Sequence, residues 1–144
     1  MLSWIVTKLV SRMMAGLRRG DYSLVLRLDA DDVRLRFPGD SSWGGEFRGK
    51  AEHEQWLRRF VAAGLQIFPD QVVAKGLPWK LTLCVRGHIY LRDPEGPTVY
   101  ENRYVIWGLI RWGKLKEYEV FEDTEKTEGL DQYLAGPQLS RSSA

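Results

Sequence analysis

A chain of 144 residues fits one domain that buries a single sizeable core. Its 21 basic and 19 acidic residues nearly balance, so neither nucleic acid nor a strongly acidic surface is expected as a partner. The single cysteine cannot form an internal disulfide and favours a reducing, cytoplasmic location. Six Trp, six Tyr and five Phe indicate either an aromatic core or an apolar cavity.

The chain begins with apolar residues at helical spacing over about 3–19, followed by Gly20, a favourable residue just past a helix end. We expect an amphipathic helix packed on the domain; the alternative is a helix lying in a membrane interface. Lys8 and Arg12 interrupt the apolar run, which argues against a secretory signal. No stretch approaches the ~18 apolar residues of a membrane span. We therefore expect no membrane partner.

The elements that follow are predicted from periodicity and turn residues. A short helix is expected over 22–32 and a strand over 33–37, after which a Gly- and Ser-rich loop carries Trp43 and Phe47. A third helix follows over about 51–63. The remaining elements are strands over 66–77, 79–93, 98–111 and 114–123, a helix over 127–135, and a tail, 136–144, expected to be disordered.

Helices followed by a long antiparallel meander are typical of an α+β domain. Strands this long must twist and curl, and helices on the concave side of such a sheet would leave a cone with a mouth. The sequence therefore predicts one domain, residues 1–135, that encloses a pocket.

Four segments, in this order, carry a family resemblance: RRGDYSLVLRLDADDVRLRFPG, EFRGKAEHEQWLRRF, YENRYVIWGLIRWGKLKEY and EDT. Together they resemble the SnoaL-like branch of the NTF2-like superfamily. The resemblance implies a cone-shaped α+β barrel with N-terminal helices on the concave face of a curved, mostly antiparallel sheet, commonly dimeric through the convex face. The superfamily includes isomerases, cyclases, epoxide hydrolases, dehydratases and non-enzymatic binding domains, so the fold alone does not give the activity.

Ketosteroid isomerase chemistry is not expected. By the resemblance, the positions of its carboxylate base, tyrosine and protonated aspartate correspond to Phe37, Met13 and, approximately, Ile106. None of these side chains can accept or donate a proton.

Limonene epoxide hydrolase resembles the chain more closely. Its Arg-x-Asp pair corresponds to Arg86 and His88, and its aspartate after the last strand corresponds to Asp123, the position that also suits the acid/base aspartate of the polyketide cyclase. The tyrosine and asparagine that help to hold its water fall on Leu35 and Phe37, so half of that apparatus is missing.

Alternation in the segment CVRGHIYLRD places Arg86 and His88 on one strand face, which we expect to look into the cone. There His88 would act as general acid/base, Asp123 would orient its ring, and Arg86 would stabilise developing negative charge. The alternatives are a surface histidine and a charge pair of Arg86 with Asp123 or Glu101. The second histidine, His53 in the third helix, is expected in solvent.

Two further sets of side chains are predicted to contact partners. The first set is expected to line the ligand pocket, with polar groups that orient the ligand and aromatic side chains that contact it: Asn102, Tyr104, Trp43, Phe37, Phe47 and Trp79. The opposite sheet face, with Val105, Trp107 and Leu109, is apolar enough to predict a homodimer.

No spacing of His and Cys suggests a metal site, and GGEFRGK lacks the pattern of a phosphate loop, so no metal and no cofactor are expected. Two function classes remain. The first is a cofactor-independent enzyme, with cyclase, isomerase, hydrolase or hydratase chemistry, that acts on a small hydrophobic carbonyl or epoxide compound. The second is a non-catalytic domain that binds a small hydrophobic molecule.

Overall fold

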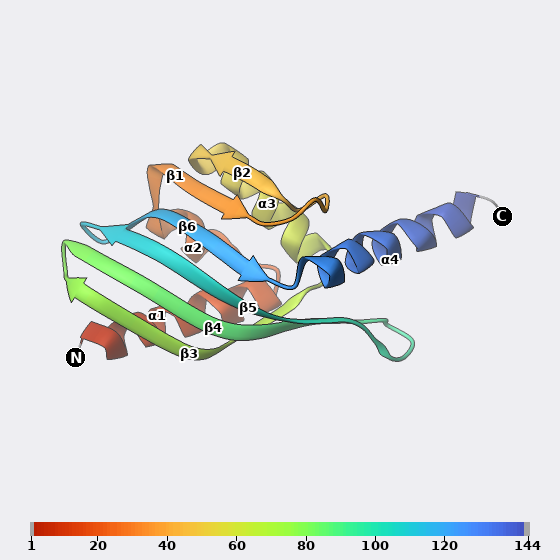
Figure 1. Cartoon of the computed structure of the whole chain (residues 1–144), viewed down its shortest axis with the longest axis horizontal. Coiled ribbons are helices and arrows are strands. Elements are labelled where there is room, and N and C mark those ends of the chain that lie inside the picture. The colour runs from red at the N-terminus through yellow and green to blue at the C-terminus, as the bar shows by residue number, and fades with distance from the viewer. Residues whose placement is uncertain (1, 143–144) are drawn as a thin grey trace.

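The computed structural model describes residues 2–142, and their side chains as far as Ala135 (Figure 1). Three helices and two strands occupy residues 2–62, and four long strands and a last helix follow. In chain order the elements are α1 (Leu2–Arg18), α2 (Ser23–Leu28), β1 (Asp29–Phe37), β2 (Gly45–Arg48), α3 (Gly49–Ala62), β3 (Gln66–Leu77), β4 (Lys80–Arg92), β5 (Thr98–Arg111), β6 (Lys114–Glu122) and α4 (Thr124–Ser142).

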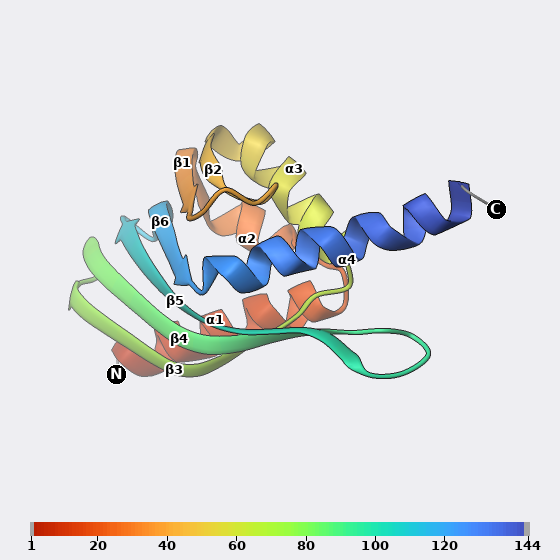
Figure 2. The same ribbon diagram turned by 45° about the vertical axis from the view of Figure 1, so that its right-hand side comes forward.

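The six strands form one curved sheet in the order β2-β1-β6-β5-β4-β3, and only the β1–β6 pair is parallel. Helices α1, α2 and α3 lie on the same side of this sheet, while α4 extends away from its end (Figures 1 and 2). The α+β cone with helices on the concave face, predicted from the sequence, is confirmed.

Local chemistry explains where α1 ends. Gly20 adopts a φ of 84° just past the helix, and its amide donates to the carbonyl of Leu17 at 3.1 Å. The amide of Asp21 donates to the carbonyl of Gly16 at 2.8 Å. This pair of bonds is the Schellman arrangement, which favours glycine because the left-handed region is costly for other residues.

The second helix and first strand differ from the prediction. The sequence predicts a helix to Asp32, whereas α2 ends at Leu28 and Asp29 opens β1. Tertiary contacts supply the reason: Asp29 lies opposite Leu115 of β6, and its side chain is buried against His53 of α3, contacts that the local sequence pattern does not display. The short strand β2 was predicted as loop; it pairs with β1 between Arg34 and Phe37.

The core lies between α1, α3 and the concave face of the sheet. Strand β4 shows the pattern most clearly, because every second residue is buried. Its buried apolar side chains are Leu81, Leu83, Val85, Ile89 and Leu91. Full burial of each such side chain contributes roughly 1.5–3 kcal/mol to the free energy of unfolding. These residues therefore determine which face of β4 points towards the helices.

The last helix runs further than the sequence predicts. Helix α4 continues to Ser142, through most of the segment expected to form a tail, and the end of the predicted tail, 143–144, lies outside the described residues. The domain boundary at residue 135 stays a prediction. No helix within residues 2–142 is long and apolar enough to cross a membrane.

Candidate functional site

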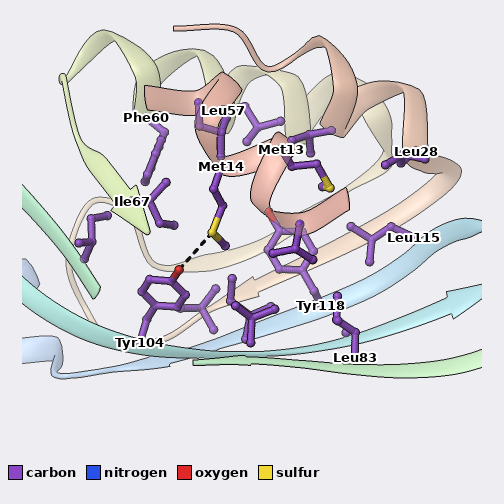
Figure 3. A pocket seen from close by; sticks show the side chains of 18 of the residues that line it. Met13, Met14, Leu28, Leu57, Phe60, Ile67, Leu83, Tyr104, Leu115 and Tyr118 are labelled. Atoms are coloured by element: carbon purple, nitrogen blue, oxygen red, sulfur yellow. Dashed lines mark hydrogen bonds between the residues drawn. The ribbon is translucent and has the colours of Figure 1, made fainter. Parts of the chain in front are cut away.

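A cavity of about 290 Å³ lies between the helices and the concave face of the sheet (Figure 3). This volume is at the lower end of the range for small-molecule sites. Its wall is almost wholly apolar. Helices contribute Met13, Met14, Leu57 and Phe60, and the sheet contributes Leu83, Tyr104, Leu115 and Tyr118.

A row of three hydrogen-bonded side chains reaches the cavity from the protein interior. The carboxylate Oδ2 of Asp29, at the start of β1, lies 2.5 Å from Nδ1 of His53 on α3. The other ring nitrogen, Nε2, lies 2.6 Å from the hydroxyl of Tyr118 on β6. Tyr118 lines the cavity, so the row connects the cavity wall to a buried carboxylate.

Two members of the Asp29–His53–Tyr118 row are sealed from solvent. The exposed fraction is 0% for His53 and 1% for Asp29. The second carboxylate oxygen of Asp29, Oδ1, is buried without a hydrogen-bond partner among the described residues. An acceptor-only carboxylate fixes Nδ1 of His53 as the donating nitrogen, which leaves Nε2 to accept from Tyr118 or, when His53 is protonated, to donate to it.

Burial raises the pKa of Tyr118 well above its usual value of 10.0, and the nearby negative charge of Asp29 raises it further. The phenol is therefore neutral across the physiological range, able both to donate and to accept a hydrogen bond at the cavity wall.

A second polar group lies further along β6. Glu122 and Tyr100 both line the cavity. Burial is the largest cause that raises the pKa of Glu122, and the hydroxyl of the buried Thr127 donates to its carboxylate. The amide of Asn102 donates to Tyr100 Oη at 3.1 Å and to the carbonyl of Asp123 at 3.0 Å. Asn102 thus connects Tyr100 to the end of β6 through hydrogen bonds, and it is not among the cavity-lining residues.

The predicted ligand contacts divide into two groups. Phe37, Trp43 and Tyr104 line the cavity, whereas Asn102, Phe47 and Trp79 are not among the lining residues. The hydroxyl of Tyr104 donates to the carbonyl of Phe68 at 2.7 Å and lies 3.3 Å from Met14 Sδ (Figure 3). Tyr104 therefore presents its apolar ring to the cavity, while its hydroxyl is already hydrogen-bonded within the protein. A role in ligand binding stays a prediction for all six residues.

The prediction that Arg86 and His88 point into the cone is wrong. Arg86 is exposed, and His88 Nδ1 lies 2.9 Å from Asp70 Oδ1 on the outer face of the sheet. The ring of His88 stacks on that of Phe68, with centroids 5.0 Å apart. Neither residue lines the cavity.

The residue between them, Gly87, is the one that faces inward. A Cβ there would lie 2.1 Å from the carbonyl oxygen of Phe68 and 2.3 Å from the hydroxyl of Tyr104, so no larger residue fits. The apolar residues of β4 had to face the helices, and Arg86 and His88 therefore had to face outward.

Asp123 does not meet His88 either. Its carboxylate Oδ1 accepts from the amide of Glu125 at 3.1 Å, at the start of α4. A carboxylate at this position caps the helix, which satisfies one of the unpaired amides of the first turn.

His53 is the functional candidate that the sequence reasoning misplaced, because it was expected in solvent. It shares a helix face with Trp56, Leu57 and Phe60, all of which are buried. Spacings of three, four and seven residues put these side chains on one side of a helix, and this signal was present in the sequence.

Comparison with known proteins supports the fold. The sequence matches the SnoaL-like domain over residues 10–118. No curated protein matches the chain. An NTF2-like protein of unknown function from Burkholderia pseudomallei is 22% identical, with a TM-score of 0.71 over 87% of this chain and 95% of that one.

Two further solved structures are similar. An NTF2-like protein from Burkholderia xenovorans is 23% identical, with a TM-score of 0.65 over 84% of this chain and 91% of its own. TerC, co-crystallized with polyporic acid, is 23% identical, with a TM-score of 0.68 over 85% of this chain and 97% of its own. At these identities the likeness concerns the fold alone. Because the domain match spans more than half of its residues, the chain belongs to the family of SnoaL-like domains.

Proposed function

We propose that the protein is a cofactor-independent enzyme that performs acid–base chemistry on a small hydrophobic carbonyl or epoxide compound held in the cavity. The observation that carries the proposal is the Asp29–His53–Tyr118 row, which ends in a phenol on the wall of an apolar cavity. The proton moves among side chains of the chain itself, so no cofactor is needed.

The position of the row argues for function. Burying a carboxylate and an imidazole costs several kcal/mol unless they pair with each other, and an apolar pair of similar volume would often be as stable. Retaining both groups, fully buried and directly behind a cavity wall, is the arrangement expected of an acid/base site.

The proton can move in either direction along the row. A ligand hydroxyl or bound water gives its proton to Tyr118 Oη while Tyr118 gives its own proton to His53 Nε2. The imidazolium that forms is stabilised by the carboxylate of Asp29. In the reverse step His53 returns the proton to Tyr118, which passes its own to an oxygen of the ligand. No atom is gained or lost by the protein in the cycle.

The alternative function is non-catalytic binding of a small hydrophobic molecule, which the nearly apolar wall also favours. That TerC was co-crystallized with polyporic acid makes hydrophobic organic acids sensible members of a ligand panel. The panel should also include ketones and epoxides of similar size.

We further propose a homodimer through the convex sheet face around Val105, Trp107 and Leu109. Trp107 is 51% exposed, and the neighbouring strand adds Phe121, which is 49% exposed. Trp107 lies opposite Glu119 and Leu109 opposite Glu117, so the apolar patch is narrow and edged by carboxylates. Exposed apolar side chains that lie side by side favour a contact with a partner. A cytoplasmic location remains a prediction from the single cysteine.

The test is a matched pair of tyrosine variants. Tyr118→Phe removes the hydroxyl that ends the row, whereas Tyr104→Phe removes a hydroxyl from the same cavity that is bonded to Phe68 and Met14. On a substrate found with the panel, Tyr118→Phe should lower kcat by ~100-fold or more, while Tyr104→Phe should leave kcat within about tenfold.

Equal turnover by the wild type and Tyr118→Phe would exclude the proposed mechanism. A wild-type protein that binds members of the panel, with saturable tryptophan fluorescence changes, but converts none of them would be a binding domain.

A further inference from the structure

Most of the exposed large apolar side chains gather at one end of the molecule. Of the eight in the described residues, five come from the first turn or two of α1 and from the turns that join β3 to β4 and β5 to β6. These parts lie together at the left of Figures 1 and 2. We define the tryptophan end as Trp4, Ile5, Leu77, Trp79 and Trp112.

The fold holds the tryptophan end together. The rings of Trp79 and Trp112 stack with centroids 6.4 Å apart, and the amide of Trp112 donates to the carbonyl of Trp79 at 3.1 Å. The hydroxyl of Ser3 donates to the carbonyl of Ala74 at 3.4 Å, which brings the start of α1 alongside the end of β3.

Trp112 is an unusual choice for its position. It is 80% exposed and has a φ of 52°, a conformation that disfavours bulky residues. Asparagine or glycine would suit this turn better. Apart from the stacking on Trp79, most of the indole surface stays exposed and is free for a contact outside the chain.

The charged residues in the segments that form the tryptophan end are all positive. The sequence has no Asp or Glu in residues 2–9, 74–82 or 109–115, which are the start of α1 and the two turns with their flanking strand ends. Asp32 on β1 lies beyond them and pairs with Lys116. The cations in these segments are Lys8, Lys75, Lys80, Arg111 and Lys114. Within the described part of the chain, none of the five has a carboxylate within 4.0 Å, although Lys8 lies over the ring of Trp4 at 4.4 Å.

The cavity extends to this same end. Its lining includes Leu2 in the first turn of α1, Pro78 in the β3–β4 turn and Gly113 in the β5–β6 turn. The tryptophan end thus borders the cavity that a hydrophobic ligand would occupy.

We propose that the tryptophan end is a docking surface for an anionic lipid bilayer. Indole rings prefer the boundary between headgroups and acyl chains, and each lysine or arginine near an anionic surface adds about 1 kcal/mol of attraction. Docking would bring the cavity to the bilayer, where hydrophobic compounds collect; this last step rests on the proposed function, whereas the docking does not. The sequence-based expectation of no membrane partner considered only the first helix and spanning segments.

Charge argues against a second copy of the chain at this surface. In a symmetric dimer the same patch meets itself, so the five cations of one copy would face the five of the other. Two such patches repel, whereas phosphate groups of an anionic bilayer complement them.

Co-sedimentation of the full chain with vesicles tests the proposal. Vesicles of phosphatidylcholine mixed with phosphatidylglycerol should retain the protein at least ~10-fold more strongly than vesicles of phosphatidylcholine alone, and added salt should weaken the retention. The double variant Trp79→Ser with Trp112→Asn should lose ~10-fold or more of the binding, since two interfacial indoles are removed.

Matched variants distinguish binding through the tryptophan end from nonspecific binding of the protein to vesicles. Trp107→Ser removes an indole from the convex sheet face, 51% exposed in the single chain, and should keep the preference for anionic vesicles even where loss of the proposed dimer weakens the overall binding. Lys80→Glu should abolish the preference for anionic vesicles, whereas Arg103→Glu, the same charge reversal away from the tryptophan end, should keep most of it. Thermal melting checks that each variant is folded.

Absence of sedimentation of the wild type with both vesicle types would overturn the proposal, as would equal binding to the two vesicle types or loss of the anionic preference in the Trp107 variant. A concentration-dependent increase in mass that the Trp79/Trp112 variant removes, without vesicle binding, would assign the surface to a second copy. The assay contains no small ligand, so its result is independent of whether the cavity is catalytic.

Discussion

The chain has two histidines, and each pairs with an aspartate, but on opposite sides of the sheet. His53 and Asp29 lie 2.5 Å apart on the inner side, where both side chains are 0% exposed. His88 and Asp70 lie 2.9 Å apart on the outer side, where the exposed fractions are 45% and 49%. The chemical groups are the same, and only their access to water differs.

That difference decides what each pair can do. Water screens the outer pair, so its net contribution to the free energy of unfolding is about 0–1 kcal/mol. The inner pair has no water to replace a lost partner, and it touches a tyrosine on a cavity wall. Removing one partner there leaves an uncompensated buried group, which costs far more than the pair contributes.

The largest expected effect follows from this comparison. Asp29→Ala should lower the free energy of unfolding by about 3–5 kcal/mol, because His53 is left without its acceptor in a dry environment. Asp70→Ala, the matched change on the outer face, should lower it by no more than about 1 kcal/mol. Urea unfolding followed by tryptophan fluorescence measures both. Equal losses would mean that water reaches the inner pair.

Turnover should separate the histidines next. His53→Gln can still donate to Asp29 and accept from Tyr118, but an amide cannot carry the proton onward. On a substrate of the wild type it should therefore lower kcat by ~100-fold or more with KM little changed. His88→Gln should leave kcat unchanged, because His88 does not line the cavity. A large loss of kcat in the His88 variant alone would place the catalytic site on the outer face of the sheet.

The two histidines also show what could be predicted from the sequence. The α+β order, the long strands and the turn after α1 follow from periodicity and from residues such as Gly20, and these predictions are confirmed. The inward side of β5 was predicted through Tyr104, which lines the cavity. These features depend on local patterns and on the burial of apolar side chains, which a single sequence displays.

The side of β4 was predicted wrongly, because the family's Arg-x-Asp pair was given more weight than the apolar residues on the alternate positions. Val85 lies opposite Ile106 and both line the cavity, so Arg86 must lie outside. The Asp29–His53–Tyr118 row joins residues 24 and 65 positions apart. Only the parallel β1–β6 pairing and the packing of α3 bring them together, and no local pattern predicts that.

A smaller effect should appear at high pH. Burial raises the pKa of Tyr118 in the folded protein above the 10.0 of a free phenol. The folded state then holds this proton more tightly than the unfolded state, so stability is complete below pH ~10 and falls as the pH rises above it. Tyr118→Phe has no proton to lose. It should show a shallower loss of stability above pH ~10, measured by urea unfolding at a series of pH values.

Tyr100→Phe serves as a comparison, because Tyr100 lines the cavity outside the row and burial also raises its pKa. An alkaline loss that is the same in the wild type and in Tyr118→Phe would show that the phenol of Tyr118 is solvated in the folded protein.

The smallest effect belongs to the outer pair. His88→Ala removes both the contact with Asp70 and the stacking on Phe68, and it should change the free energy of unfolding by no more than about 1 kcal/mol. Because the pair lies in water, rising salt should diminish the part that comes from its charge. Urea unfolding of the wild type and His88→Ala at low and high sodium chloride measures this part. Asp70→Ala, which removes the other partner of the pair, is measured in the same way for comparison. If salt does not change the difference between the two proteins, the contribution of His88 comes from its stacking on Phe68. A loss of stability as large as that of Asp29→Ala would contradict the placement of His53 on the buried face and of His88 on the solvent-exposed face of the sheet.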